Sequence, residues 1–182
     1  MKIFKKVALA FVVLVALILV VAAFQPADFK VERSATIGAP VEVVFAQVSD
    51  FHNWGAWSPW EKLDPNMKKS YEGPPSGAGS ITSWVGNHEV GEGKMTMTEA
   101  GANALIRIKL EFLKPFAATN LAEFNFKTDG AATTVSWSMS GQKNFPMKLF
   151  SLFMSCDKMI GGDFEKGLAA MKAVAEAATS KK

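Results

Sequence analysis

The chain has 182 residues, of which 20 are basic and 17 acidic, for a net charge of +3. Lys2, Lys5 and Lys6 account for that excess, so the rest of the chain is formally neutral and its composition argues against nucleic acid as a partner. A single cysteine, Cys156, excludes an intrachain disulfide framework and a cysteine-rich zinc site.

The N-terminal segment carries an unbroken apolar run from Val7 to Phe24, directly after the three lysines. A helix of this length spans about 27 Å, close to the roughly 30 Å hydrocarbon core of a bilayer. The run is longer than the apolar core of a usual signal peptide, which favours a retained anchor. The small residues Val21-Ala22-Ala23 are also compatible with signal-peptidase cleavage, so a cleaved signal remains an alternative. We therefore divide the chain into a membrane anchor or signal segment, residues 1–26, and one folded domain, residues 27–182.

The position of the lysines predicts the orientation of this segment. Basic residues stay on the cytoplasmic side of a membrane. We expect a single-pass protein of the inner (cytoplasmic) membrane, with its C-terminal domain on the periplasmic or extracytoplasmic side.

The domain begins with a predicted strand over 29–37, whose apolar parity is interrupted by Arg33. Pro40 starts a helix with apolar residues at helical spacing from Val41 to Val48. Asp50 is placed to cap a second short helix over 51–57, which Ser58-Pro59 is expected to end.

From about Met67 the apolar period changes to two, which is typical of strands separated by turns. The predicted strands cover 68–73, 79–86, 92–99, 104–113, 119–128 and 131–140. A loop over 141–146 precedes a long helix over 147–179, with an irregularity at Gly161-Gly162. The sequence predicts an α+β fold in which an antiparallel sheet packs its apolar face on the long helix.

Several segments resemble the START-like (SRPBCC) superfamily, the polyketide cyclase and lipid-transport group. They are residues 31–37 with Ala39-Pro40 and Val44-Phe45, Asp50-Phe51 with Trp54, Trp57 and Ser58-Pro59-Trp60, Tyr71-Glu72-Gly73-Pro74 with Gly77, Gly79 and Trp84, and residues 162–168. The resemblance covers about 28–178. It implies the helix-grip fold, a curved antiparallel sheet of about seven strands around a long C-terminal helix, with an internal cavity that often holds a hydrophobic ligand. Members include enzymes, carriers and regulators, so the fold does not select among them.

One parity of the strands after residue 90 is free of charge, while the other parity carries the lysines, arginine and glutamates. Such a face suits either a dry core or the lining of a pocket for an apolar ligand. The predicted lining is Trp54, Trp57, Trp84, Met95, Met97, Ile108, Leu110, Phe124, Phe126, Trp137, Met139, Phe153, Asp157 and Phe164.

Two features of this lining have alternative interpretations. Asp157 falls on the apolar stripe of the long helix (Phe150, Phe153, Ile160, Phe164, Leu168 and Met171), where it could orient a polar head group, or it marks a restart of that helix. Trp54, Trp57 and Trp60 could form the mouth of the cavity, or pack the short helices onto the sheet.

The sequence shows no catalytic set and predicts no cofactor and no metal site. His52 lies beside Asp50 as a surface or capping pair, and His88-Glu89 lacks the second histidine of a zinc-protease motif. The leading hypothesis is an exported, membrane-tethered domain that binds a hydrophobic small molecule or lipid without transforming it. A cyclase- or isomerase-like enzyme that uses Asp157 or Arg33, and a protein-interaction module with a filled core, remain as alternatives.

Overall fold

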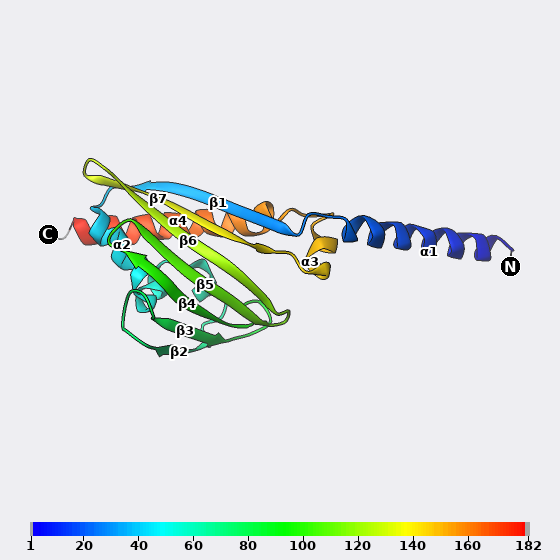
Figure 1. Cartoon of the computed structure of the whole chain (residues 1–182), viewed down its shortest axis with the longest axis horizontal. Coiled ribbons are helices and arrows are strands. Elements are labelled where there is room, and N and C mark those ends of the chain that lie inside the picture. The colour runs from blue at the N-terminus through cyan, green and yellow to red at the C-terminus, as the bar shows by residue number, and fades with distance from the viewer. Residues whose placement is uncertain (1, 181–182) are drawn as a thin grey trace.

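A computed structural model describes residues 2–180. Seven antiparallel strands form one sheet, in the order β1-β7-β6-β5-β4-β3-β2 (Figure 1). The strands are β1 (Asp28–Ile37), β2 (Lys68–Glu72), β3 (Ile81–Val85), β4 (Glu92–Gly101), β5 (Leu105–Lys114), β6 (Ala118–Asp129) and β7 (Ala132–Gln142). The helices are α1 (Lys2–Ala23), α2 (Val41–Ser49), α3 (Phe145–Phe150) and α4 (Cys156–Thr179), with the 3-10 helices η1 (Phe51–Ala56) and η2 (Pro59–Lys62). The predicted helix-grip fold is confirmed.

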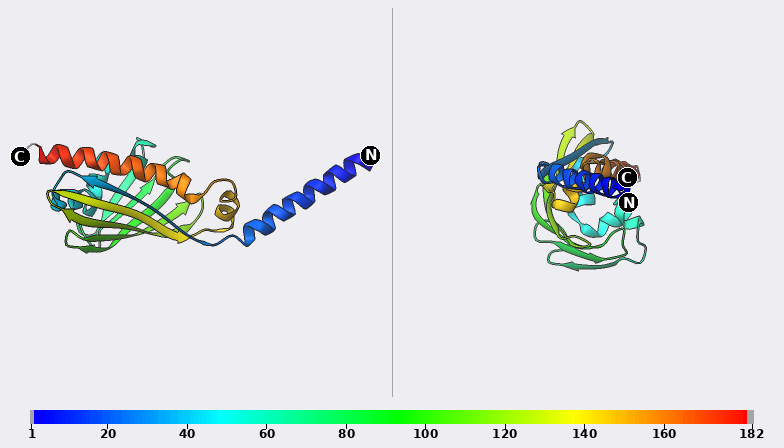
Figure 2. Two further views of the ribbon diagram at one scale, coloured as in Figure 1. Left: turned by 90° about the horizontal axis from the view of Figure 1, so that it is seen from above. Right: turned by 90° about the vertical axis from the view of Figure 1, so that its right-hand side faces the viewer.

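Helix α4 lies along the concave side of the curved sheet (Figure 2). It packs against β1, α2 and both 3-10 helices. Its buried side includes Phe164, Leu168 and Met171, as the helical spacing predicted. The core of the domain therefore lies between this helix and the sheet.

The strand register explains which side chains share the concave face. Directly opposed residues of antiparallel strands point to the same side of a sheet. Phe124 of β6 pairs with Trp137 of β7, and Trp137 pairs with Arg33 of β1. The predicted uncharged parity is thus the buried one, with Arg33 as the cation at its edge.

The predicted continuous helix over 147–179 is wrong. It is divided into α3 and α4 by an irregular segment, residues 151–155. Each helix starts at its own cap: the side chain of Asn144 accepts from the backbone N–H of Met147, and that of Ser155 from the N–H of Lys158. Gly161 and Gly162, the expected irregularity, lie inside regular helix.

The region around the second predicted helix also differs from expectation. Residues 51–56 form a 3-10 helix whose N-cap is Asp50, as predicted, and this carboxylate also contacts Nδ1 of His52 at 2.8 Å. Pro59 does not end the helical region but begins η2, because proline is well tolerated in a first helical turn.

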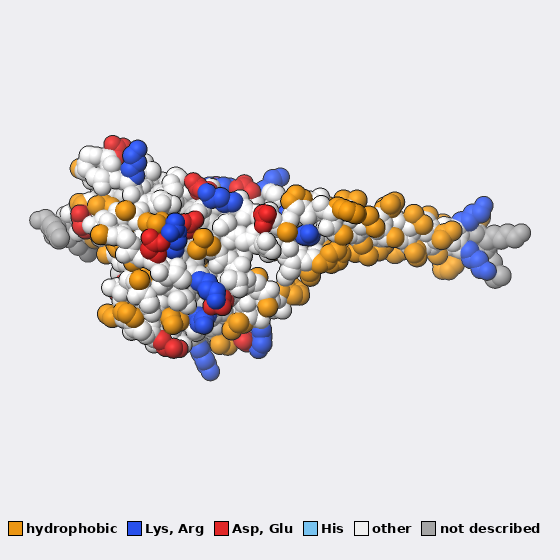
Figure 3. Space-filling view, in the orientation of Figure 1, with side chains coloured by type: hydrophobic (Ala, Val, Ile, Leu, Met, Phe, Trp, Pro, Cys, Tyr) orange, Lys and Arg blue, Asp and Glu red, His pale blue; other side chains and the backbone are white. Residues whose placement is uncertain are grey.

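Helix α1 projects away from the domain (Figures 1 and 2). Its stretch Ile3–Ala23 is long and apolar enough to cross a membrane. Hydrophobic side chains cover its surface along its length (Figure 3). They meet few protein neighbours, because most of them are exposed.

Candidate functional site

Stacked aromatic rings fill one half of the concave face. Trp137 stacks on Phe164 of α4 at a centroid distance of 4.0 Å, and on Phe124 of β6 at 4.9 Å. Trp57 meets both Trp137 and Phe124 edge-on. The tryptophans in and beside η1 and η2 therefore pack these 3-10 helices onto the sheet and α4. Of the two interpretations of this cluster, the structure supports packing over a cavity mouth.

The other half of the concave face is less covered. Met95, Leu110 and Phe112 are half-buried there, and so is Trp84. The indole N–H of Trp84 donates to the carbonyl oxygen of Val90 at 3.0 Å. Its ring occupies the space that a side chain at position 93 would need, so glycine is required at that position.

Two buried polar atoms on this face have no hydrogen-bond partner among the described residues. They are Oδ1 of Asn120, in a residue only 7% exposed, and the indole N–H of Trp137. The side-chain amide of Asn120 has one weak contact, 3.9 Å from Nδ2 to the sulfur of Met139. A buried polar group without a partner costs free energy, so both atoms are suited to meet a ligand.

Asn120 lies between the two halves of the face. It opposes Leu110 of β5 and Gly141 of β7. A side chain at position 141 would occupy the place of the Asn120 amide oxygen, so Gly141 makes room for it. Asn120 was missed in the sequence, although it has the same parity as Ala122 and Phe124.

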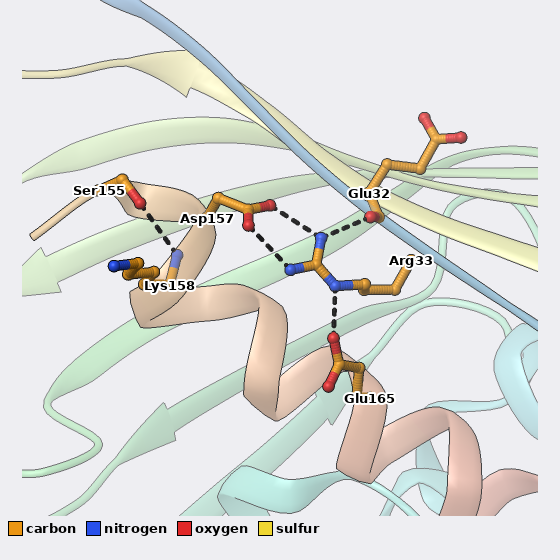
Figure 4. A network of polar contacts seen from close by, with 6 residues as sticks. All are labelled: Glu32, Arg33, Ser155, Asp157, Lys158 and Glu165. Carbon is orange, nitrogen blue, oxygen red and sulfur yellow. Dashed lines mark hydrogen bonds and ion pairs between the residues drawn. The ribbon is translucent and has the colours of Figure 1, made fainter.

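Arg33 joins β1 to α4 through its guanidinium group (Figure 4). Its Nη1 and Nη2 donate to the two carboxylate oxygens of Asp157 at 2.8 and 2.9 Å, and its Nε donates to Glu165 at 2.6 Å. The group lies over Gly161, where a Cβ would collide with it. Its hydrogen bonds to Asp157 hold the pKa of that carboxyl below its usual value.

The structure places most of the predicted lining residues in the interior. Nine are buried and three half-buried: Trp54, Trp57, Met97, Ile108, Phe124, Phe126, Trp137, Met139 and Phe164, and then Trp84, Met95 and Leu110. The expected inward positions of Phe153 and Asp157 are wrong. Phe153 lies in the irregular segment and is 77% exposed. Asp157 lies in the first turn of α4, and its side chain is 57% exposed at the edge of the face, where it is bonded to Arg33.

Two pockets lie away from the concave face. One, of about 250 Å³, is bounded by Phe51, by the stacked rings of His52 and Tyr71, and by the turn after β2. The other, of about 420 Å³, is a shallow hollow over β4 to β7. Within residues 2–180, no cluster of three or more His, Cys, Asp or Glu side chains is arranged to hold a metal ion.

Comparison with known proteins gives one family and one fold. Residues 28–176 match the family described as polyketide cyclase / dehydrase and lipid transport. No curated protein matches the chain.

Similar solved structures include the Zhui aromatase/cyclase from Streptomyces sp. R1128, 14% identical, with 82% of this chain and 94% of that chain covered and a TM-score of 0.61. A protein of unknown function from Staphylococcus aureus is 12% identical, with coverage of 86% and 98% and a TM-score of 0.63. A protein from Nitrosospira multiformis is 20% identical, with coverage of 80% and 94% and a TM-score of 0.57. At these identities the likeness shows the fold.

Proposed function

The chain belongs to the polyketide cyclase / dehydrase and lipid transport family, and on that basis we propose that its domain binds a hydrophobic small molecule or lipid on the concave face of the sheet. Helix α1 tethers this domain to a membrane. Binding, and not chemical conversion, is the function that the site supports best.

The observation that carries the proposal is the composition of the concave face. Five strands, β1 and β4 to β7, contribute apolar side chains to it, and its cation, Arg33, is already bonded to two carboxylates of α4. Sites for small apolar molecules combine such a lining with a few polar groups. In the half that contains Met95, Leu110 and Phe112 the side chains are not fully covered by protein, which suits the body of a ligand.

The two unpartnered atoms indicate the polar chemistry of the ligand. Oδ1 of Asn120 accepts a hydrogen bond and the indole N–H of Trp137 donates one. A molecule with an apolar body and a hydroxyl or carbonyl group satisfies at least one of them, which removes a desolvation cost of about 1–3 kcal/mol.

Membrane attachment follows from α1 and the flanking lysines. An apolar helix of this length spans a bilayer, and Lys5 and Lys6 favour retention of its N-terminus in the cytoplasm. The domain then lies on the outer side of an inner membrane. The intact mass of the protein recovered from membranes tests this directly, since a cleaved signal removes about the first 23 residues.

An enzyme is the second candidate, and the Zhui aromatase/cyclase, of similar fold, is the reason to consider it. General acid–base catalysis needs a titratable group within hydrogen-bond reach of the substrate. Arg33 and Asp157 are bonded to each other at the edge of the concave face. Chemical conversion of a ligand would therefore depend on the neutral side chains of Asn120 and Trp137. This favours binding over catalysis.

Photo-crosslinking of the full chain in lipid nanodiscs tests the proposal. The probe is a long-chain fatty acid with a diazirine in its tail, and labelled peptides are identified by mass spectrometry. We expect labelling within residues 84–141, on side chains of the concave parity. Labels on α1 are discounted, because the probe also dissolves in the bilayer.

A pair of leucine variants provides the control. Leu110→Trp fills the half-buried part of the concave face, whereas Leu121→Trp adds the same bulk to an exposed position on the next strand. Leu110→Trp should abolish the labelling and Leu121→Trp should preserve it. Equal labelling of both folded variants, or labels confined to the outer parity, would contradict the proposed site.

A further inference from the structure

Large hydrophobic side chains are exposed at one end of the domain. Among residues 28–180, those exposed by 47% or more are Val85, Leu113, Phe116, Phe145, Phe150, Phe153 and Met154. We call this set the apolar rim. Phe153, at 77%, and Phe150, at 66%, are its most exposed members.

The strand register places these side chains at the same end. Val85 at the end of β3 pairs with Glu92, which pairs with Lys114 at the end of β5, beside Leu113 and Phe116. Asn120 near the start of β6 pairs with Gly141 near the end of β7, shortly before α3. In Figure 1 the end of β5 lies on the side of the domain from which α1 extends, and α3 lies beside the end of α1.

The membrane helix joins the domain at this same end. Helix α3 packs against α1, and Nζ of Lys148 donates to the carbonyl oxygen of Ala23 at 3.4 Å. Residues 24–27 alone connect α1 to β1, and four residues reach at most about 14 Å. Phe145 and Phe150 of α3 are therefore held close to the end of the membrane span, at the same end of the domain as the rest of the apolar rim.

The charges around the rim suit a lipid surface. Residues 143–156 contain Lys143 and Lys148 and no acidic residue. Lysines beside exposed aromatic and aliphatic side chains are typical of segments that lie in the interfacial layer, where the ammonium groups reach the head groups. The surface of a soluble monomeric protein seldom exposes so many large apolar side chains together.

We propose that the apolar rim docks into the interfacial layer of the bilayer that α1 crosses, so that the domain sits upright on the membrane with α3 and the β5–β6 turn in lipid. This inference rests on the proposed anchoring by α1. The half-buried part of the concave face, with Leu110 and Phe112, lies toward the same end. A ligand then passes between bilayer and protein without crossing water.

Site-directed fluorescence on the full chain tests the docking. In a Cys156→Ala background, a single cysteine at Phe153→Cys or Phe116→Cys carries an environment-sensitive NBD label. Ala131→Cys, in the β6–β7 turn at the opposite end of the domain, is the matched control. The protein is reconstituted in phosphatidylcholine vesicles with a minority of phosphatidylglycerol, with and without nitroxide-labelled lipid.

We expect the nitroxide lipid to quench the labels at 153 and 116 several-fold more than the label at 131. If the protein floats with the vesicles but all three labels are quenched alike, the docking is wrong and the anchoring stands. A label at 153 that is shielded from water yet not quenched by lipid indicates a protein partner and also overturns the docking. Loss of the protein from the vesicles overturns the anchoring together with the docking.

Discussion

Arg33 on β1 and Asp157 in the first turn of α4 form a bidentate ion pair between the edge strand of the sheet and the helix, with both guanidinium–carboxylate contacts below 3 Å. The pair connects β1, an edge strand of the sheet, to the start of the helix that covers the concave face. Glu165, two turns further along α4, holds the same guanidinium group. This cluster therefore links the first turns of α4 to β1.

The first prediction concerns the pH dependence of stability. The folded-state pKa of Asp157 is lowered, so its contribution is complete above the unfolded pKa of about 4 and is lost as the pH falls through the folded pKa. Asp157→Asn should flatten the decline in stability below about pH 5. Thermal unfolding of the full chain in nanodiscs over a pH series measures this.

The double variant supplies the control for this prediction. Glu111, whose pKa is lowered mainly by a hydrogen bond from Lys109, contributes with the same sign and remains in the variant. Arg33→Met combined with Asp157→Asn should flatten the curve no more than Asp157→Asn alone. A further flattening would show that Arg33 also acts through its second carboxylate partner, Glu165.

The second prediction compares two glycines of α4. An added Cβ at Gly167 would lie 2.8 Å from Cζ3 of Trp137, which is stacked on Phe164, whereas Gly162 has open space. Gly167→Ala should destabilise the domain by about 1–3 kcal/mol, because the packed ring must move. Gly162→Ala should stabilise it by roughly 0.5–1 kcal/mol, as expected inside a helix. Urea unfolding followed by tryptophan fluorescence distinguishes them, and equal effects would contradict the packing described.

The third prediction separates stability from binding at Asn120. Asn120→Leu removes a buried amide that lacks a full set of partners and keeps a similar shape. The unliganded protein should be as stable as the parent or more stable, by up to about 1 kcal/mol. Binding of a fatty alcohol, measured by quenching of tryptophan fluorescence, should weaken several-fold, while binding of the matching alkane should not. A loss of both would mean that the variant perturbs the face as a whole.

The fourth prediction concerns α1. Leu14 lies near the middle of the apolar stretch, where an arginine costs about 2.5–3.5 kcal/mol of insertion free energy. Leu14→Arg should reduce the fraction of protein that stays with membranes after a carbonate wash. Ile3→Arg, at the lysine-bearing end, should leave it near the parental level. If both variants behave alike, α1 is not a membrane span.

The sheet was predictable because alternation determines which side of a strand is buried. The uncharged parity from Met95 to Met139 is the buried parity, and Arg33 interrupts it as expected. The tryptophans at spacing three could also be identified, but whether they cover a mouth or fill a core depends on how the 3-10 helices fold back. That depends on long-range packing against Phe124 and Trp137, which local spacing does not encode.

The division of the last helix was harder to predict. Apolar residues at helical spacing continue through Phe150 and Phe153, so the periodicity does not reveal a break. The capping residues Asn144 and Ser155 are the available signal, and serine is also acceptable within a helix. Asn120 could not be predicted from the apolar pattern, because it is a polar residue on the same parity as Ala122 and Phe124.

The sheet has a free edge at β2, a short strand whose five residues are all exposed and include Lys68, Lys69 and Glu72. An unpaired edge can recruit a strand from another molecule, and charged side chains discourage this. The risk is greater for copies held on one membrane, where two dimensions bring them together more often than free diffusion in three. With the anchoring by α1 that we propose, the charged, five-residue β2 would protect neighbouring domains against edge-to-edge aggregation.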